Sequence, residues 1–219
     1  MATTALLLGS TGLVGGCLLR RLLAAPGIDR VIAPTRRPLE VGHPKLQNQV
    51  IDLQGPLDGP ELQADDVYCA LGTTIKTAGS KEAFRAVDYD LPLRFARGQR
   101  ERAGKRFFLV SSMGASATSS IFYSRTKGEV ERDLAAEGFK AVIVARPSIL
   151  AGHRAESRPM ERAALWLAPA YDNLLWGPLR KYRSIQADAV AAALLALAGD
   201  VLSGTRIVLS DELQALAQR

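Results

Sequence analysis

A short apolar run that ends in a glycine turn constrains the fold of this chain more than any other feature. Residues 5–8 are apolar, glycines follow at positions 9, 12 and 15, and a helical pattern begins there. This order predicts a strand, a tight turn and a helix. Gly9 would permit the turn, Gly12 would leave the backbone open to a pyrophosphate, and Gly15 would let the helix pack close to the strand. The amides of the first helical turn would then bind the phosphate. An ordinary strand-to-helix connection is the alternative interpretation.

Further short runs of apolar and β-branched residues alternate with helical patterns along the chain. We predict strands at residues 30–34, 50–53, 66–71, 106–110 and 141–145. A long helix is predicted at residues 81–102. The alternation indicates a doubly wound parallel sheet with helices on both faces, a Rossmann fold, in one domain of residues 1–219. The carboxyl ends of the first, fourth, fifth and sixth strands would then form a common rim.

Length and cysteine content limit the class of protein. The 219 residues, 47% of them hydrophobic, are enough to bury one substantial core. Cys17 and Cys69 form no close pair and have no histidines at metal-binding spacing, which indicates reduced thiols. We expect no metal site. The pair Arg20-Arg21 follows the first apolar stretch instead of preceding it, unlike the order in a secretory leader. We therefore predict a cytoplasmic protein.

The net charge of +6 calls for an anionic partner or a well-solvated surface. Basic residues gather in and just after the predicted long helix, at Arg94, Arg97, Arg100, Arg102, Lys105 and Arg106. They lack the interleaved aromatic pattern of a base-stacking surface, so we expect a solvated face and no nucleic-acid partner. The apolar stretch at 189–199 is shorter than the roughly 20 residues of a membrane-spanning helix, so no membrane partner is expected either.

Two arginines follow the second predicted strand. A dinucleotide fold that prefers NAD commonly has an acidic residue at this place, whereas an arginine can accommodate the 2′-phosphate of NADP. Arg36 and Arg37 stand here, and the sequence has no carboxylate between Asp29 and Glu40. The pattern predicts NADP(H) as the cofactor, although both arginines could simply lie on a solvated loop. Asp52 ends the third predicted strand, where ligand-contacting residues of open parallel sheets gather.

Polar residues with a catalytic pattern follow the fifth predicted strand. Ser111 and Ser112 end that strand, and Tyr123 and Lys127 come later on a predicted helix. Side chains four residues apart share one face of a helix, so Tyr123 and Lys127 would lie side by side.

These motifs together resemble the short-chain dehydrogenase/reductase superfamily, in particular its extended and atypical branches. The resemblance rests on Gly9-x-x-Gly12-x-x-Gly15, Asp52-Leu53, the two serines, Tyr123-x-x-x-Lys127 and Arg146-Pro147. More narrowly, the chain is similar to the Tat-interacting-protein type of oxidoreductase in Leu71-Gly72-Thr73-Thr74, in residues 123–131 and in Glu156-Ser157-Arg158-Pro159. The similarity extends from about residue 5 to residue 190.

The resemblance implies a role for each of the polar residues. Tyr123 would be the general acid that protonates a carbonyl oxygen while the nicotinamide delivers hydride to its carbon. Lys127 would favour the phenolate and hold the nicotinamide ribose. Ser112 would polarise the same carbonyl, with Ser111 as the alternative. Classical members often have an asparagine in the helix after the fourth strand, and the nearest candidate here is Asp88.

The cofactor would contact the glycine turn and the ends of several strands. The expected cofactor-binding residues are Gly9, Thr11, Gly12, Leu13, Val14, Gly15, Arg36, Arg37, Asp52, Leu53, Leu71, Gly72, Ser111, Tyr123, Lys127, Pro147, Leu150 and Arg158. Residues 152–183 would form a small C-terminal substrate lobe or lid, in which Arg158 reaches the cofactor or an anionic group of the substrate.

The motifs are compatible with two classes of function. The first is an NADP(H)-dependent oxidoreductase that acts on a small carbonyl or alcohol as a monomer or homodimer. The alternative is a noncatalytic dinucleotide sensor that acts through a protein partner. A complete set of serine, tyrosine and lysine favours the enzyme, because a sensor has no chemical need for the tyrosine.

Overall fold

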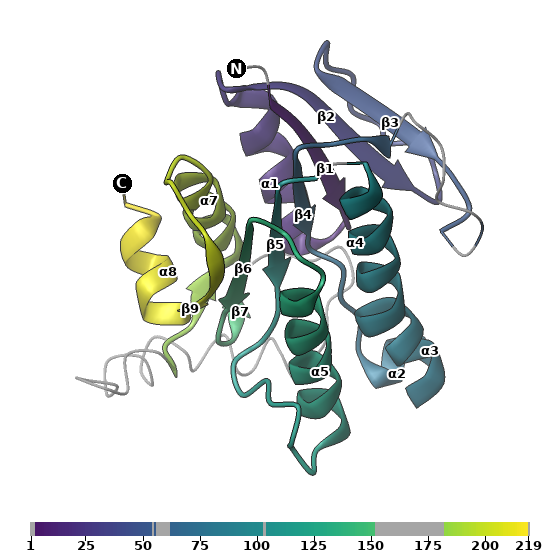
Figure 1. The fold of residues 1–219 in the computed structure, drawn as a ribbon, viewed down its shortest axis with the longest axis vertical. Coiled ribbons are helices and arrows are strands. Elements are labelled where there is room, and N and C mark those ends of the chain that lie inside the picture. The colour runs from purple at the N-terminus through teal and green to yellow at the C-terminus, as the bar shows by residue number, and fades with distance from the viewer. Residues whose placement is uncertain (1–2, 54, 56–61, 103, 152–181, 219) are drawn as a thin grey trace.

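A parallel sheet forms the centre of the computed structural model, which describes residues 3–53, 55, 62–102, 104–151 and 182–218 (Figure 1). Seven strands are paired in the order β3-β2-β1-β4-β5-β6-β9, and every neighbouring pair is parallel. The strands are β1 (Thr3–Leu8), β2 (Ile28–Thr35), β3 (Leu46–Val50), β4 (Asp66–Cys69), β5 (Arg106–Val110), β6 (Ala141–Arg146) and β9 (Gly204–Leu209). A separate short pair joins β7 (Leu150–Ala151) to β8 (Ile185–Gln186). The doubly wound Rossmann fold predicted from the sequence is confirmed.

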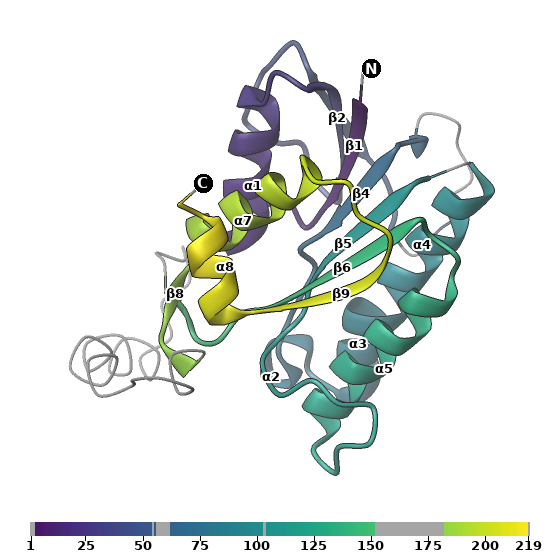
Figure 2. The same cartoon turned by 60° about the vertical axis from the view of Figure 1, so that its left-hand side comes forward.

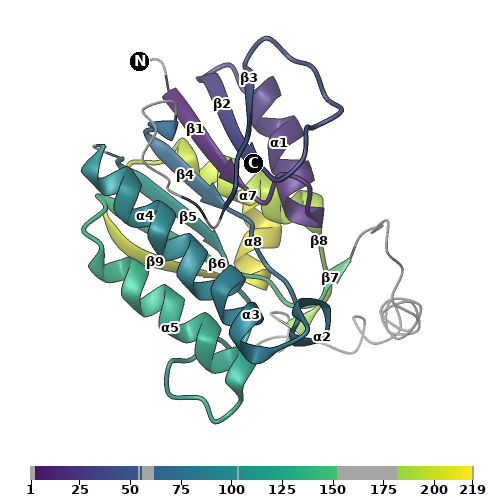
Figure 3. The same ribbon diagram turned by 90° about the vertical axis from the view of Figure 1, so that its right-hand side faces the viewer.

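Helices cover both faces of the sheet (Figures 2 and 3). One face carries α1 (Leu13–Ala24), α7 (Ala187–Ala198) and α8 (Ser210–Leu216), and the other carries α4 (Leu91–Glu101) and α5 (Phe122–Ala136). Adjacent strand residues point to opposite faces, so Phe107 packs in one core and Phe108 in the other. Burial on both faces explains why the central strands are continuous apolar runs.

The third strand lies earlier than predicted. We expected it at residues 50–53, whereas β3 spans Leu46–Val50 and Asp52 follows it in a connection. Its sequence, Leu-Gln-Asn-Gln-Val, is largely polar because β3 is an edge strand that is only partly buried. The more apolar residues 50–53, which were predicted as the strand, come at the end of β3 and just after it.

The long helix predicted at 81–102 is divided in three. Short helix α2 (Ile75–Ala78) precedes α3 (Lys81–Arg85), which continues through a π-helical turn, η2 (Ala86–Asp90), into α4. The N–H of Leu91 donates to the carbonyl of Ala86, five residues back. Pro92 has no N–H to donate to the carbonyl of Asp88, so the regular α-helical pattern cannot continue unbroken through this point.

The C-terminal part of the chain adds a strand, β9, that the sequence did not predict. Strand β9 pairs in parallel with β6 along its whole length, from Gly204 beside Ala141 to Leu209 beside Arg146. The apolar stretch at 189–199 lies mostly within α7, whose buried side chains pack in the core beside α1. No helix among the described residues is both long and apolar enough to cross a membrane. Most of the predicted lobe at 152–183, including Arg158, lies outside the described residues.

Candidate functional site

The glycine turn between β1 and α1 has the tight geometry expected from the sequence. Gly9 adopts a φ of +81°, and a Cβ on this residue would lie 2.6 Å from the carbonyl oxygen of Ala70. A Cβ on Gly15 would lie 1.9 Å from the carbonyl oxygen of Gly9, so only glycine lets α1 approach the turn this closely. Gly12 is exposed and caps α1 without a side-chain hydrogen bond. The first-turn amides of α1 are thus left for another acceptor.

The glycine turn follows β1, the strand at which the order of the sheet changes side: β2 and β3 lie on one side of β1, and the later strands lie on the other. Strand β1 pairs with β2 on one side and with β4 on the other. In open parallel sheets, ligands bind at the carboxyl ends of the strands next to such a point. The backbone N–H of Ala70 donates to Leu8 over 2.9 Å and brings the loop after β4 beside the glycine turn. Leu71 and Gly72 therefore continue along this rim.

Helix α5 presents Tyr123 and Lys127 one turn apart. The Tyr123 ring lies 5.5 Å, centroid to centroid, from the ring of Phe84 on α3. The Lys127 side chain is only 5% exposed, and its Nζ lies 2.7 Å from Oδ1 of Asp88 in η2, which is fully buried. A Cβ on Gly72 would lie 3.9 Å from this Nζ. The structure thus brings together Gly72 and Lys127, which we had predicted to contact the same cofactor.

The charge of Lys127 depends on its neighbours. Burial acts to lower the pKa of Lys127 and is the largest single influence on it. Attraction and a hydrogen bond to Asp88, together with Tyr123 and Cys69, outweigh burial, so that this pKa is raised. Burial also raises the pKa of the Cys69 thiol, to about 12, so Cys69 is an inert neutral neighbour at physiological pH.

The two serines after β5 have different surroundings. The Ser111 hydroxyl is buried and donates a hydrogen bond to Glu131 of α5. The same carboxylate accepts a hydrogen bond from the Nε of Arg146 over 3.1 Å. The Ser112 hydroxyl is buried too, yet it has no hydrogen-bond partner among the described residues. An unpaired buried hydroxyl costs about 1–3 kcal/mol. Of the two serines, Ser112 therefore has the hydroxyl that is left for a further partner.

Arg36 and Arg37 follow β2 and are exposed. Their loop is held through its backbone, because Thr35 Oγ1 donates to the carbonyl of Arg37 over 2.7 Å and accepts the side-chain amide of Asn48 over 2.8 Å. Within the part of the chain that the structure describes, neither guanidinium pairs with a carboxylate. Both are therefore available to an anion. Asp52 lies in the connection after the neighbouring strand β3 and is exposed.

Two arginines that we expected on a solvated face are structural. Arg94 donates to the carbonyls of Leu53 and Gly55, over 3.1 and 2.5 Å, and holds the loop that follows β3. Arg106 pairs with the buried Asp66 at the start of β4 and donates to the carbonyl of Ala198 at the end of α7. The start of a buried strand could have signalled the role of Arg106, whereas no sequence pattern indicates that of Arg94.

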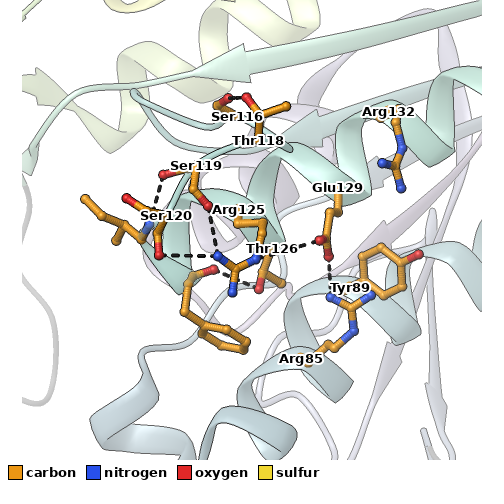
Figure 4. A network of polar contacts seen from close by, with 12 residues as sticks. Arg85, Tyr89, Ser116, Thr118, Ser119, Ser120, Arg125, Thr126, Glu129 and Arg132 are labelled. Atoms are coloured by element: carbon orange, nitrogen blue, oxygen red, sulfur yellow. Dashed lines mark hydrogen bonds and ion pairs between the residues drawn. The ribbon is translucent and has the colours of Figure 1, made fainter.

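A polar network holds the start of α5 (Figure 4). Arg125 donates to the carbonyls of Ser119 and Ser120, over 2.9 and 3.3 Å, in the segment that leads into the helix. On the next turn, Glu129 pairs with Arg85 of α3 over 2.5 Å. Tyr123 lies in the first turn of α5, so these contacts fix the backbone that carries it.

The remaining predicted residues lie after β6. Pro147 is buried, and its carbonyl accepts the N–H of Met113 from the loop after β5 over 2.9 Å. Leu150 begins β7. The cradle at the glycine turn and the unpartnered Ser112 hydroxyl fit a nicotinamide dinucleotide at this rim.

Relatives match this chain along most of its length, although no protein-family model matches it. "Protein fmp52, mitochondrial" of Aspergillus clavatus is 37% identical over 220 residues, which cover 95% of this chain and 94% of the relative. "Protein FMP52, mitochondrial" of Meyerozyma guilliermondii is 36% identical over 164 residues, which cover 74% of this chain and 71% of the relative. These names contradict the cytoplasmic location that we predicted. Reduced cysteines do not specify a compartment, because thiols stay reduced in more than one of them.

Solved structures share the fold at low sequence identity. MoeE5 in complex with UDP-glucose and NAD superposes with a TM-score of 0.70 at 17% identity, covering 98% of this chain and 80% of that chain. UDP-glucuronic acid 4-epimerase from Bacillus cereus, in complex with UDP-glucuronic acid and NAD, has a TM-score of 0.69 at 15% identity and covers 94% of this chain and 76% of its own. They support the Rossmann-like fold. The narrower resemblance to the Tat-interacting-protein type stays a prediction.

Proposed function

This chain belongs to the family of proteins named Fmp52, and from that starting point we propose that it is an NADP(H)-dependent oxidoreductase of the short-chain dehydrogenase/reductase kind. The substrate would be a small carbonyl or alcohol compound. The observation that carries the proposal is the arrangement of Tyr123 and buried Lys127 on α5, at the same rim as the unpartnered Ser112 hydroxyl.

The cofactor-binding residues follow the rim of the sheet. The amides at the start of α1 would bind the pyrophosphate, and Lys127 beside Gly72 would hold the nicotinamide ribose. Arg36 and Arg37 would bind the 2′-phosphate, which is the basis for preferring NADP(H). The similar solved structures contain NAD, and this supports a nicotinamide dinucleotide in general without distinguishing the two forms.

Proton transfer would be the task of the side chains around the substrate. When bound, the nicotinamide supplies or accepts hydride. The Tyr123 phenol would donate its proton to the substrate oxygen, and the Ser112 hydroxyl would donate a hydrogen bond to the same oxygen. The Lys127 ammonium would stabilise the phenolate that this transfer leaves behind. In the reverse direction the same groups would remove the proton of an alcohol.

Turnover of a panel of aldehydes, ketones and quinones with NADPH tests the proposal. We expect Tyr123→Phe to leave NADPH affinity nearly unchanged and to lower turnover by about 10² to 10⁴, the usual contribution of a positioned acid. Lys127→Ala should weaken both binding and turnover. Tyr89→Phe is the matched control, because Tyr89 donates to Asp133 at the contact between η2 and α5.

Two results would count against the enzyme. Full turnover in Tyr123→Phe would rule out the assigned chemistry. A wild type that binds NADPH tightly but oxidises it no faster than Tyr123→Phe with every compound would favour the alternative of a dinucleotide sensor that acts through a protein partner.

A further inference from the structure

A buried carboxylate that the proposed chemistry does not use lies against Lys127. Asp88 is fully buried in η2, with its Oδ1 2.7 Å from the Lys127 Nζ. Its other oxygen, Oδ2, accepts the backbone N–H of Thr73 over 2.9 Å. We propose that Asp88 is the positioning residue that keeps Lys127 protonated and in place at the cofactor rim. The functional meaning of this pair rests on the function proposed above, but the pair itself can be tested without cofactor.

The contact is built from two helical spacings that match. Phe84 and Asp88 are four residues apart on the segment that runs from α3 into η2, and Tyr123 and Lys127 are four residues apart on α5. The aromatic rings of Phe84 and Tyr123 pack together, and Asp88 and Lys127 form an ion pair. The π-helical turn is part of this arrangement, because Asp88 lies within it, and such turns are frequent at functional sites.

Asp88 is the group that contributes most to keeping Lys127 protonated. An ammonium that is buried without a counterion tends to lose its proton, because burial disfavours the charged form. The groups that act on Lys127 come from three elements: Asp88 from η2, Tyr123 from α5 and Cys69 from β4. Burial raises the pKa of Cys69 to about 12, and Tyr123 contributes less than Asp88 does to the raised pKa of Lys127. Within the described residues, Asp88 is the one carboxylate paired with Lys127.

Asp88 also joins three parts of the rim. Through Thr73 it holds the loop after β4, and through Lys127 it holds α5, while its own backbone belongs to the segment that leads into α4. A neutral residue in its place could preserve the hydrogen bond to Thr73 but not the charge that faces Lys127. Asp88→Asn therefore separates the electrostatic role from the packing role.

The first experiment follows the lysine side chains of the cofactor-free protein by ¹³C NMR at the Cε position. The chain has few lysines, and Lys127→Met identifies the Lys127 signal. In the wild type we expect Lys127 to titrate above the exposed lysines, whose usual pKa is about 10.4. In Asp88→Asn the titration midpoint of Lys127 should fall by at least about 2 pH units, since the pKa of an unpaired buried lysine shifts down by up to 3–5 units.

The control variant Asp133→Asn makes the same chemical change on the partly exposed side of α5 and should leave the titration of Lys127 unchanged. An unshifted Lys127 in Asp88→Asn would overturn the proposal.

The double variant Asp88→Asn/Lys127→Met keeps the idea testable if Asp88→Asn folds poorly. It removes both charges, and neutral pairs often replace buried ion pairs without loss of stability. We expect it to melt at a higher temperature than Asp88→Asn alone. If the double variant loses as much melting temperature as Asp88→Asn and Lys127→Met lose together, Asp88 does not act through Lys127.

The pH dependence of NADPH affinity separates this inference from the proposed function. Wild-type affinity should be nearly constant from pH 7 to 9.5, whereas in Asp88→Asn it should weaken by about tenfold or more as Lys127 loses its proton. If the Lys127 midpoint falls in Asp88→Asn and NADPH affinity does not follow, the role of Asp88 stands. In that case it is the proposed role of Lys127 in holding the cofactor that fails.

Discussion

Ser111 and Ser112 are neighbours in the chain, yet their hydroxyls face different surroundings. Ser111 is joined to Glu131 and, through it, to Arg146, so that it ties the end of β5 to α5 and to β6. Ser112 is buried without a partner among the described residues. A difference of one position thus separates a hydroxyl that is bonded to the protein from one that has no partner among the described residues.

Substitution of each serine by alanine tests this difference. We expect Ser112→Ala to lower turnover by about 10² to 10³, the usual effect of removing one donor to a reacting oxygen, with little change in stability. Ser111→Ala should leave the Glu131 carboxylate short of a donor and lower the free energy of unfolding by about 1–3 kcal/mol. Turnover assays and urea unfolding of both variants measure the two effects. The reverse pattern would exchange the roles of the serines.

Cofactor choice is also decided by individual residues. Arg36 and Arg37 are exposed after β2, so we expect NADPH to bind more tightly than NADH. Loss of a guanidinium-to-phosphate contact costs about 1.5–3 kcal/mol, or roughly ten- to a hundredfold in affinity. Titration of both cofactors against Arg36→Ala/Arg37→Ala measures this loss. Arg97→Ala, which removes an exposed arginine on α4 that pairs with Glu137, is the control. Equal wild-type affinities for NADPH and NADH would contradict the prediction.

Among the elements, α5 carries the most of the candidate site and is confined on several sides. Glu129 and Asp133 contact residues of α3 and η2, while Glu131 reaches the ends of β5 and β6. Gly128 lies where the segment before α5 crosses the helix: a Cβ there would be 2.1 Å from the backbone nitrogen of Ala117. Close packing of this segment therefore requires glycine inside the helix.

Two helical glycines provide a matched pair for a stability measurement. Glycine inside a helix is about 1 kcal/mol less favourable than alanine. Gly16→Ala in α1 should therefore stabilise the protein, because its new Cβ would meet only the carbonyl oxygen of Ser10 at 3.7 Å. Gly128→Ala should instead destabilise it by about 1–3 kcal/mol through the backbone clash. Urea unfolding compares both with the wild type, and a stabilising Gly128→Ala would show that this segment can move away at little cost.

At the scale of the whole molecule, charged contacts join the amino ends of the central strands. The Asp65 carboxylate accepts the N–H of Thr4 in β1 over 2.9 Å and pairs with Lys105, which precedes β5, over 2.8 Å. The neighbouring pair of Asp66 and Arg106 joins β4 to β5 and to the end of α7. These contacts lie at the amino ends of the strands, whereas the candidate site lies at their carboxyl ends. We therefore expect them to affect stability and not chemistry.

The contacts of Asp65 predict a loss of stability in acid. Burial alone would raise the pKa of Asp65, but Lys105 and the Thr4 N–H, with Arg106, together lower it. The unfolded chain then binds the proton at a higher pH than the folded protein does. The stabilising effect of Asp65 is therefore full above its unfolded pKa, near 3.9, and is lost as the pH falls through the lower folded value. Urea unfolding between pH 6 and pH 2.5 should have a weaker acid dependence in Asp65→Asn, but not in the exposed control Asp29→Asn. An identical dependence in Asp65→Asn and wild type would show that this carboxyl does not contribute.

The sequence by itself determined the features that are local. Gly9 is required by its positive φ and Gly15 by a clash with the carbonyl of Gly9, six residues earlier. Tyr123 and Lys127 share a face because of the helical repeat, and the apolar central strands are readable because both faces of the sheet are covered. The tertiary structure decided what depends on contacts between distant segments: Asp88 against Lys127, Ser111 against Glu131, and the edge strands β3 and β9. Edge strands are buried on fewer sides and so have weak apolar patterns. The partner of a buried charge is chosen by packing between elements, which no spacing along the chain records.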